Sequence, residues 1–152
     1  MRTKLTILAL SIAALVASCT GGQQQKQHTG ETVSITHTLG TVEVPVNPQR
    51  VVVLDFSALE NLDYIGIKPV GMPKQGVPSH LSKYKNDASI ADVGTVVEVN
   101  LEKINELQPD LIIIGGRLAE SYDDLSAIAP VMYPVVLNTT NFMGAFKTVL
   151  ND

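Results

Sequence analysis

The residues best suited to bind a ligand stand directly after an apolar stretch. Residues 111–114 are Leu-Ile-Ile-Ile, and Gly115, Gly116 and Arg117 follow them. A guanidinium keeps its charge at physiological pH and presents several donors in a fixed fork, which suits the oxygens of an anion. The two glycines carry no side chains and leave the space before this group clear. The stretch therefore predicts a binding site for an anionic ligand.

The sequence offers little for metal binding or catalysis. Cys19 is the only cysteine, which excludes an internal disulfide and a CxxC site. Ser57 follows Asp55, but the Gly-x-Ser-x-Gly elbow of hydrolases is missing and no histidine is placed to act as its base. The three histidines show no close pair of the kind that zinc and haem sites use. They are His28, His37 and His80. We predict no metal site, no cofactor, no catalytic residue and no enzymatic activity.

A helix and a strand must position the Gly-Gly-Arg stretch. Asn100 is a suitable N-cap, apolar residues recur at the helical period over 101–107, and Pro109 ends the helix. The unbroken apolar run at 111–114 favours a parallel strand covered on both faces. Ligands of open α/β sheets bind outside the carboxyl ends of the strands, which is where Arg117 falls.

The preceding segments complete an α/β pattern. Residues 32–37 and 42–44 alternate between apolar and polar, which predicts an N-terminal β-hairpin. Residues 51–54 form a second apolar run typical of a buried strand. Ser57 is a plausible N-cap for the helix that follows, and Gly66 a plausible C-cap. This order of elements predicts a mostly parallel sheet flanked by helices.

The remaining predicted elements are shorter. In chain order they are a short strand at 69–72, an irregular segment at 73–84 with one helical turn near Ser79, a turn at 92–94, a helix at 122–128, an edge strand at 131–137, and a last amphipathic helix from Asn141 that is cut off at Asp152. The sequence thus stops in mid-element, as a truncated product or a partial gene would.

The N-terminus has the features of an export signal. A basic start, an apolar run and small residues precede Cys19. Val16-Ala17-Ser18-Cys19 resembles the lipobox of bacterial lipoproteins, in which the cysteine carries a lipid. We predict a signal peptide at 1–18, a flexible lipid-anchored tether at 19–31 and an α/β lobe at 32–152.

The overall composition fits one globular domain. The chain has 152 residues, of which 45% are hydrophobic and 17% charged, and a net charge of −4. An acidic body without a basic patch predicts no nucleic-acid partner.

Three stretches carry a family resemblance. They are 47–55, Asn-Pro-Gln-Arg-Val-Val-Val-Leu-Asp; 62–67, Leu-Asp-Tyr-Ile-Gly-Ile; and 101–114, Leu-Glu-Lys-Ile-Asn-Glu-Leu-Gln-Pro-Asp-Leu-Ile-Ile-Ile. With the lipobox and the polar tether, they resemble the substrate-binding lipoproteins of iron-siderophore ABC importers. The resemblance implies the N-terminal lobe of a two-lobed periplasmic binding protein, with the C-terminal lobe missing from this sequence. It also implies an exported, lipid-anchored monomer that captures a ferric siderophore and hands it to the ABC permease of the inner membrane.

The Gly-Gly-Arg stretch narrows the resemblance. Together with the residues after it, it is more similar to the branch that takes up catecholate siderophores of the petrobactin and enterobactin type. Those residues are Tyr122, Asp123, Leu125 and Ile128. In that branch the arginine that matches Arg117 points into the cleft, and Lys74 matches a loop at the cleft's border. The alternatives are a surface Arg117 paired with Asp123 or Asp124, and a solvated Lys74.

Two other functions remain open at this stage. The same binding module would serve for haem, cobalamin or a hydroxamate siderophore, since the fold does not fix the cargo. An exported α/β hydrolase or reductase is the rival from another class. Against that rival stand the absent nucleophile motif, the absent cysteine pair and the absent glycine fingerprint of nucleotide-binding folds.

Overall fold

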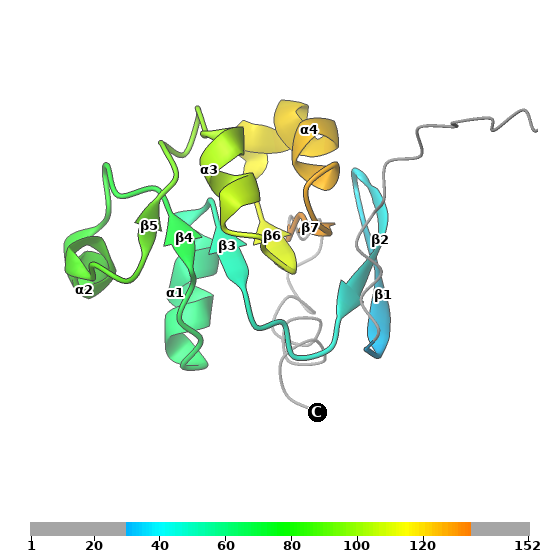
Figure 1. Ribbon diagram of the computed structural model, residues 1–152, viewed down its shortest axis with the longest axis horizontal. Coiled ribbons are helices and arrows are strands. Elements are labelled where there is room, and N and C mark those ends of the chain that lie inside the picture. Colours follow the sequence, from blue (N-terminus) through cyan, green and yellow to red (C-terminus); the bar gives the residue numbers. More distant parts are fainter. Residues whose placement is uncertain (1–29, 135–152) are drawn as a thin grey trace, which may run out of the picture.

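The computed structural model describes residues 30–134. The predicted signal, Cys19, nearly all of the predicted tether and the predicted last helix lie outside the described residues, as does the end of the predicted edge strand. The described part contains a two-stranded hairpin beside a five-stranded sheet that carries helices on its faces (Figure 1). This arrangement confirms the predicted α/β class with a parallel sheet and an N-terminal hairpin.

The hairpin and the sheet differ in strand direction. Strands β1 (Thr32–His37) and β2 (Gly40–Pro45) pair antiparallel, with Thr32 opposite Pro45. The five strands of the sheet are all parallel and stand in the order β5-β4-β3-β6-β7. Their bounds are Val51–Val53 for β3, Gly71–Met72 for β4, Ala91–Asp92 for β5, Leu111–Ile113 for β6 and Val131–Met132 for β7. The chain therefore builds outward from β3 in one direction, returns, and builds outward in the other from β6.

Short helices connect the strands. The α-helices are α1 (Phe56–Tyr64), α2 (Ser82–Asn86), α3 (Leu101–Glu106) and α4 (Tyr122–Ser126), and the 3₁₀ helices are η1 (Ser79–Leu81) and η2 (Gly116–Ser121). Residues of α1, η1 and α2 pack on one face of the sheet, and residues of α3, η2 and α4 pack on the other. Within the described residues, no helix has the length and apolar character needed to cross a membrane.

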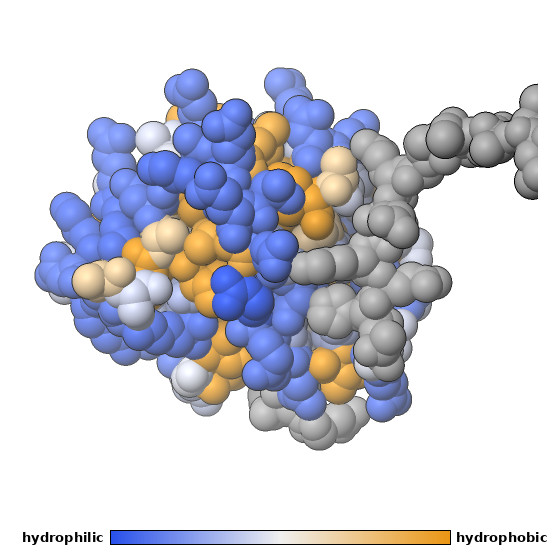
Figure 2. All heavy atoms as spheres, in the orientation of Figure 1, coloured by the Kyte–Doolittle hydropathy of each residue, from blue (hydrophilic) through white to orange (hydrophobic). Residues whose placement is uncertain are grey.

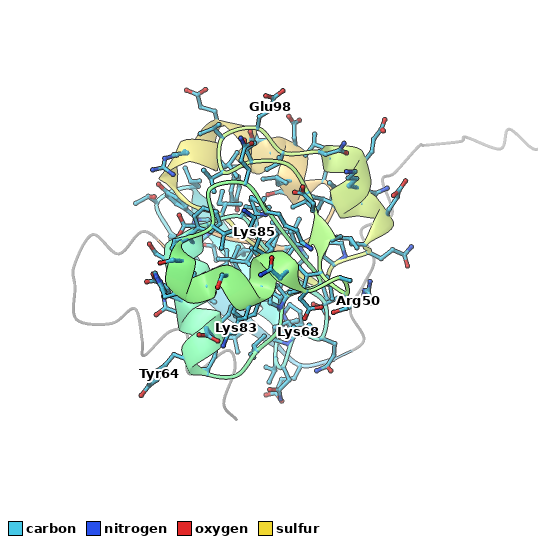
Figure 3. All side chains as sticks on the ribbon, turned by 90° about the vertical axis from the view of Figure 1, so that its left-hand side faces the viewer. Arg50, Tyr64, Lys68, Lys83, Lys85 and Glu98 are labelled. Atoms are coloured by element: carbon cyan, nitrogen blue, oxygen red, sulfur yellow. The ribbon has the colours of Figure 1, made fainter. Side chains whose placement is uncertain are left out.

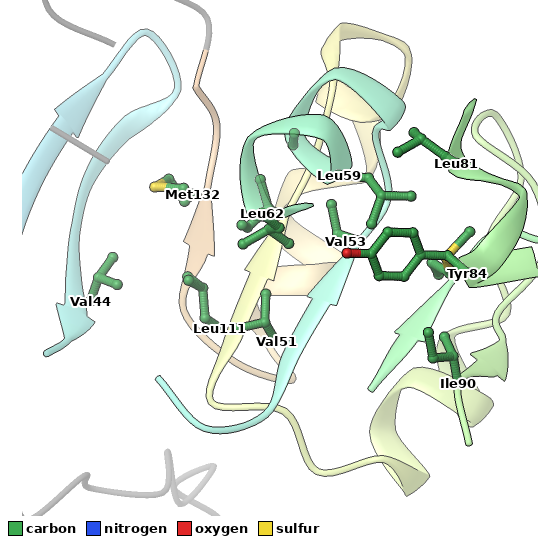
Figure 4. Close-up of a cluster of buried hydrophobic side chains, with 13 residues drawn as sticks. Val44, Val51, Val53, Leu59, Leu62, Leu81, Tyr84, Ile90, Leu111 and Met132 are labelled. Atoms are coloured by element: carbon green, nitrogen blue, oxygen red, sulfur yellow. The ribbon is translucent and has the colours of Figure 1, made fainter. Parts of the chain in front are cut away.

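Alternating side chains of the central strands divide the core in two. Val51 and Val53 face one cluster with Leu111 and Ile113, whereas Val52 faces the other. Figure 4 shows the first cluster, with Val44 and Met132 at one end and Leu81, Tyr84 and Ile90 at the other. Because β3 and β6 are buried on both faces, every side chain along them is in the core, which explains the unbroken apolar runs in the sequence.

Local capping explains where two of the helices begin and end. The side chain of Asn100 accepts a hydrogen bond from the Lys103 N–H, as predicted for the N-cap of α3. Gly66 follows the C-cap of α1 with a φ of 79°, and the Ile67 N–H donates to the Leu62 carbonyl at 2.9 Å. Such a left-handed residue suits glycine and ends the helix.

The predicted N-cap of α1 was wrong. Asp55, not Ser57, caps this helix, because its Oδ1 accepts the Ala58 N–H at 3.0 Å. Ser57 already lies within the helix. Two other elements escaped prediction: Ala91–Asp92 forms strand β5 before the turn, and Gly116–Ser121 forms the 3₁₀ helix η2 rather than an open loop. Both are too short for a periodic signal.

The hairpin covers the edge of the sheet that β7 forms. Strand β2 packs beside β7, the last strand of the sheet. The His37 Nε2 lies 3.3 Å from the carbonyl oxygen of Val131 on β7. Because the Leu39 N–H donates to Nδ1 at 3.2 Å, Nε2 carries the proton and donates to that carbonyl. The hairpin thus covers backbone groups that an exposed edge strand would offer to another chain.

A carboxylate and an arginine close the end of the sheet where the strands begin. Asp110 is only 7% exposed, and its two oxygens accept the N–H groups of Gln49 at 2.7 Å and Arg50 at 2.9 Å. The Arg50 guanidinium in turn donates to the Leu107 carbonyl, from Nε at 2.9 Å and from a terminal nitrogen at 2.6 Å. Since Leu107 is the C-cap of α3, this arginine satisfies one of the carbonyls that a helix leaves unpaired at its end. We call these residues the amino-edge lock.

The described residues include few large apolar side chains that are exposed. On the face in Figure 2, hydrophilic side chains surround hydrophobic atoms that are visible between them. Among the described residues, the exposed large apolar side chains come from three different segments. They are Tyr64, Val97 and Leu101.

Candidate ligand-binding site

The strand order fixes where a ligand has room to bind. The sheet reverses its direction of growth between β3 and β6, which are neighbours. Connections leave these two strands toward opposite faces, and ligands of open α/β sheets bind at such a switch point. Asp55 stands after β3, and Gly115 to Arg117 stand after β6. The predicted Gly-Gly-Arg stretch therefore lies at the switch point of the sheet.

Gly115 has no room for a side chain. A Cβ at this position would lie 2.4 Å from the Asp55 Oδ2 and 2.9 Å from its carboxyl carbon. The backbone after β6 thus approaches the carboxylate that caps α1. Of the two glycines, this one is required by packing rather than by the need to clear space for a ligand.

Gly116 and Arg117 are exposed at the start of η2. Leu118 holds the turn at the start of η2 in place. Its side chain is 1% exposed, and its N–H donates to the Gly115 carbonyl at 3.0 Å. No ion pair joins Arg117 to Asp123 or Asp124 within the described part of the chain. The guanidinium is therefore left available on a turn that a buried leucine holds in place.

Lys74 lies beyond the carboxyl end of β4, but its charge is engaged. Its Nζ donates to the Asp87 carbonyl at 2.8 Å, and its N–H donates to the Asp92 Oδ1 at 3.3 Å. A ligand would have to compete with that carbonyl for the ammonium. The role of Lys74 at the rim stays a prediction.

Sequence reasoning missed Tyr133 as a residue of this edge. It follows β7, the neighbour of β6, and a Cβ built on Gly116 would lie 3.3 Å from its Oη. The signal was present, because a polar-tipped aromatic stands directly after an apolar strand. The sequence does not show that β7 pairs with β6, and that pairing brings Tyr133 to Gly116.

A separate hollow lies away from the switch point. It has a volume of about 370 Å³ and is lined by Asp63, Gly66, Lys68, Lys83, Tyr84 and Asp87. Helix α1 starts beyond the carboxyl end of β3 and runs back along the sheet, so these residues lie toward the strands' amino ends. Figure 3 shows Lys68 and Lys83 on the same side of the molecule as Arg50.

The charged groups of this hollow are paired with one another. Lys68 Nζ lies 2.6 Å from Asp87 Oδ2, and Lys83 forms an ion pair with Asp63. Tyr84 donates a hydrogen bond to Asp63 at 2.7 Å. Because its cations already have partners, the hollow is a poorer anion site than the edge that carries Arg117.

These pairings shift three pKa values. Hydrogen bonds from Lys83 and Tyr84 lower the pKa of the Asp63 carboxyl. Hydrogen bonds from Lys68 and Ser89 lower the pKa of Asp87. Burial, and then the hydrogen bond to Asp63, raise the pKa of the Tyr84 hydroxyl to about 12. All three shifts favour the protonation states that the pairing requires.

Among residues 30–134, no group of three or more histidine, cysteine, aspartate or glutamate side chains is placed to hold a metal ion. The switch-point edge offers two side-chain donors instead, the Arg117 guanidinium and the Tyr133 hydroxyl. Such an edge suits oxygen atoms of an anionic molecule.

Known proteins share this fold. The family described as periplasmic binding protein matches residues 51–149. The chain belongs to the periplasmic binding protein family. It is 41% identical over 154 residues to the petrobactin-binding protein YclQ of Bacillus subtilis, covering 95% of this chain and 47% of that protein. It is 40% identical over 101 residues to the ferric-anguibactin-binding protein FatB of Vibrio anguillarum, covering 66% of this chain and 31% of the relative.

Solved structures of siderophore-binding proteins have a similar fold. The siderophore-binding protein BauB, bound to two acinetobactin molecules and ferric iron, superposes with a TM-score of 0.72 at 37% identity, over 80% of this chain and 46% of BauB. The structure of YclQ superposes with a TM-score of 0.68 at 43% identity, over 78% of this chain and 42% of that one. The chain spans about half the length of the curated relatives it matches, 47% of the first. The matches thus confirm the family resemblance and the fold of one lobe.

Proposed function

We propose that this chain is the N-terminal lobe of a substrate-binding lipoprotein that captures a ferric siderophore of the catecholate type for an ABC importer. The observation that carries the proposal is the exposed guanidinium of Arg117 at the switch point of the sheet, which has no ion-pair partner among residues 30–134. The relatives support the cargo class, because YclQ is named for petrobactin and FatB for ferric anguibactin. The function is binding and transfer, without catalysis.

The chemistry follows from the charge of the cargo. A ferric catecholate complex is anionic, and its oxygens accept hydrogen bonds. A guanidinium supplies charge and geometry together, and it does so without changing its own protonation state. Closing a second lobe over the complex would exclude water and strengthen this interaction. Lys74 would add positive charge at the rim after exchanging its contact with the Asp87 carbonyl.

The proposal includes the place of the protein in the cell. The signal at 1–18 would direct export, Cys19 would carry the lipid, and the tether would leave the lobe free to meet the permease as a monomer. Mass spectrometry of the mature N-terminus should find an acylated cysteine at position 19. An unmodified thiol there, or residues 1–18 still attached, would contradict the anchor.

The test of the binding function is a titration of the protein expressed from its complete reading frame. Calorimetry with ferric petrobactin should show that Arg117→Ala weakens binding by one to two decades, since a charge-assisted hydrogen bond contributes roughly 1.5–3 kcal/mol. Arg117→Lys keeps the charge but loses the planar fork, so it should recover only part of the affinity. Arg50→Ala is the matched control, because it removes an arginine from the opposite end of the sheet.

The outcomes separate the alternatives. Tighter binding of a ferric hydroxamate, haem or cobalamin than of ferric petrobactin would keep the module and change its cargo. Equal affinity of wild type and a folded Arg117→Ala would show that Arg117 is a surface residue, and the catecholate proposal would lose its main support.

A further inference from the structure

Tyr133 brings a hydroxyl to the ligand edge from a strand that the Gly-Gly-Arg stretch does not include. Strands β6 and β7 are parallel neighbours, with Ile113 opposite Met132. The next residues of each strand therefore leave the sheet side by side. A Cβ on Gly116 would lie 3.3 Å from the Tyr133 Oη, so this hydroxyl lies beside the backbone one residue before Arg117.

The ring of Tyr133 is held in this position by His37. The two rings meet edge to face, with centroids 6.1 Å apart and an angle of 86° between their planes. His37 is itself fixed at both nitrogens, by the Leu39 N–H and by the Val131 carbonyl. The hydroxyl is therefore preorganised by a contact between the hairpin and the sheet, and a preorganised donor loses little freedom on binding.

The hydroxyl has no hydrogen-bond partner in the part of the chain that the structure describes. Tyr133 is half-buried, and its body packs against the cluster on the α3 and α4 face of the sheet. The hydroxyl is not among the buried polar atoms that lack a partner in this part of the chain. It is therefore available to an acceptor that a ligand brings.

Tyr122 provides an internal comparison. It contacts the same histidine edge to face, with ring centroids 5.5 Å from each other, and it is half-buried as well. Its hydroxyl, however, lies near Gly40 of the hairpin, 3.9 Å from a Cβ built there. Two tyrosines thus share one cluster, but the hydroxyl of Tyr133 lies at Gly116 of the Gly-Gly-Arg stretch, whereas that of Tyr122 lies near the hairpin.

We infer that the Tyr133 hydroxyl is a second ligand donor of this site and hydrogen-bonds an oxygen of the anionic cargo beside the Arg117 guanidinium. The inference rests on the proposed binding function and deepens it, because it assigns a residue from a different strand to the same ligand. A neutral O–H donor adds direction without adding charge. A site built on such donors rejects molecules that lack an acceptor at the matching point.

The experiment compares two single-atom deletions in the protein from its complete reading frame. Tyr133→Phe and Tyr122→Phe each remove one hydroxyl from the same aromatic cluster and keep the ring. With ferric petrobactin as the probe in calorimetric titration, Tyr133→Phe should bind about tenfold more weakly than wild type, the effect of one hydrogen bond to a charged acceptor. Tyr122→Phe should bind within about twofold of wild type.

A second variant keeps the test open if Tyr133→Phe folds poorly. Gly116→Ala places a methyl group against the hydroxyl and should weaken binding by displacing it, while thermal unfolding reports whether the lobe is intact. Equal losses in the two phenylalanine variants would assign the effect to cluster packing and overturn the inference.

The remaining outcomes separate this inference from the proposed function. Wild-type affinity in Tyr133→Phe, together with weakened binding in Arg117→Ala, would overturn the role of Tyr133 and leave the binding function standing. Failure of the wild-type protein to bind ferric petrobactin or any other ferric catecholate would overturn both.

Discussion

The two ends of the parallel sheet are built in opposite ways. At the amino end, the amino-edge lock pairs the Asp110 carboxylate with two backbone N–H groups and the Arg50 guanidinium with a helix carbonyl. At the carboxyl end, Arg117 and the Tyr133 hydroxyl have no such partner among residues 30–134. One end therefore stabilises the fold, and the other carries the donors that we propose bind the ligand.

The difference has a physical cause. A buried carboxylate without hydrogen-bond partners would destabilise the fold, and the two N–H groups bound to Asp110 prevent this. A donor at a binding site has the opposite requirement, because an internal partner would compete with the ligand. Each end of the sheet carries an arginine and a second hydrogen-bonding side chain. The two ends differ in whether these groups have partners within the described part of the chain.

The largest expected effect tests the amino end. Asp110→Ala removes two charge-assisted hydrogen bonds and should lower the free energy of unfolding by about 3 kcal/mol. Urea unfolding measures this loss, and Asp110→Asn, which keeps one acceptor, should lose less. Under conditions where Asp110→Ala remains folded, its affinity for ferric petrobactin should equal that of wild type. A large drop in affinity would mean that the two ends are coupled, and the comparison would fail.

A smaller effect tests the carboxyl end. Gly115→Ala places a methyl group 2.4 Å from the Asp55 carboxylate, so the turn or the cap of α1 must shift. We expect a loss of about 1–3 kcal/mol in unfolding free energy together with weaker ligand binding, because Arg117 moves with the turn.

Gly116→Ala is the matched control for stability. Its methyl group would lie 3.3 Å from the Tyr133 Oη, a contact that a small shift relieves. Chemical unfolding of the two variants should therefore separate them clearly. Gly115→Ala as stable as wild type would show that the close approach to Asp55 is not a constraint.

The smallest effect is confined to alkaline pH. It concerns Tyr84 in the hollow whose charged side chains pair with one another, toward the amino ends of the strands. The pKa of Tyr84 rises from 10.0 to about 12 in the folded protein. Below pH 10 the hydroxyl is protonated in both states and its contribution to stability is complete. Between pH 10 and 12 the unfolded chain ionises first, so stability falls as pH rises.

Urea midpoints measured across that pH range should show the decline. Tyr84→Phe should have a flatter profile there, because it has no proton to lose. An unchanged slope in Tyr84→Phe would assign the alkaline loss to other groups. The same logic with opposite sign applies to Asp63, whose lowered pKa gives stability that is lost as pH falls below its ordinary value of 3.8.

Local signals in the sequence predicted most of the elements correctly. The cap at Asn100, the periodic apolar residues after it and the break at Pro109 gave α3 within about one residue. The apolar runs gave β3 and β6. Errors arose where two residues offered the same function. Asp55 and Ser57 are both good caps, and the backbone turn at the end of β3 decided between them.

Part of this edge was predicted from the sequence. Arg117 and Gly116 could be placed there because both stand in one stretch directly after a strand, and their role as ligand-binding residues stays a prediction. Tyr133 could not, since nothing in its neighbourhood indicates which strand β7 pairs with. The hydrogen bond from Lys74 to the Asp87 carbonyl could not be predicted from the sequence either, because the two residues meet only after the chain folds back.

The sequence by itself determined most of the elements, the class of fold and the residue types available at strand ends, because capping and periodicity depend on residues a few positions apart. Tertiary structure decided which of those residues meet. The parallel pairing of β3 with β6 sets Gly115 against Asp55 and brings Asp110 to a backbone N–H group 61 positions away. Such contacts depend on strand order and register, and no short-range pattern encodes either of them.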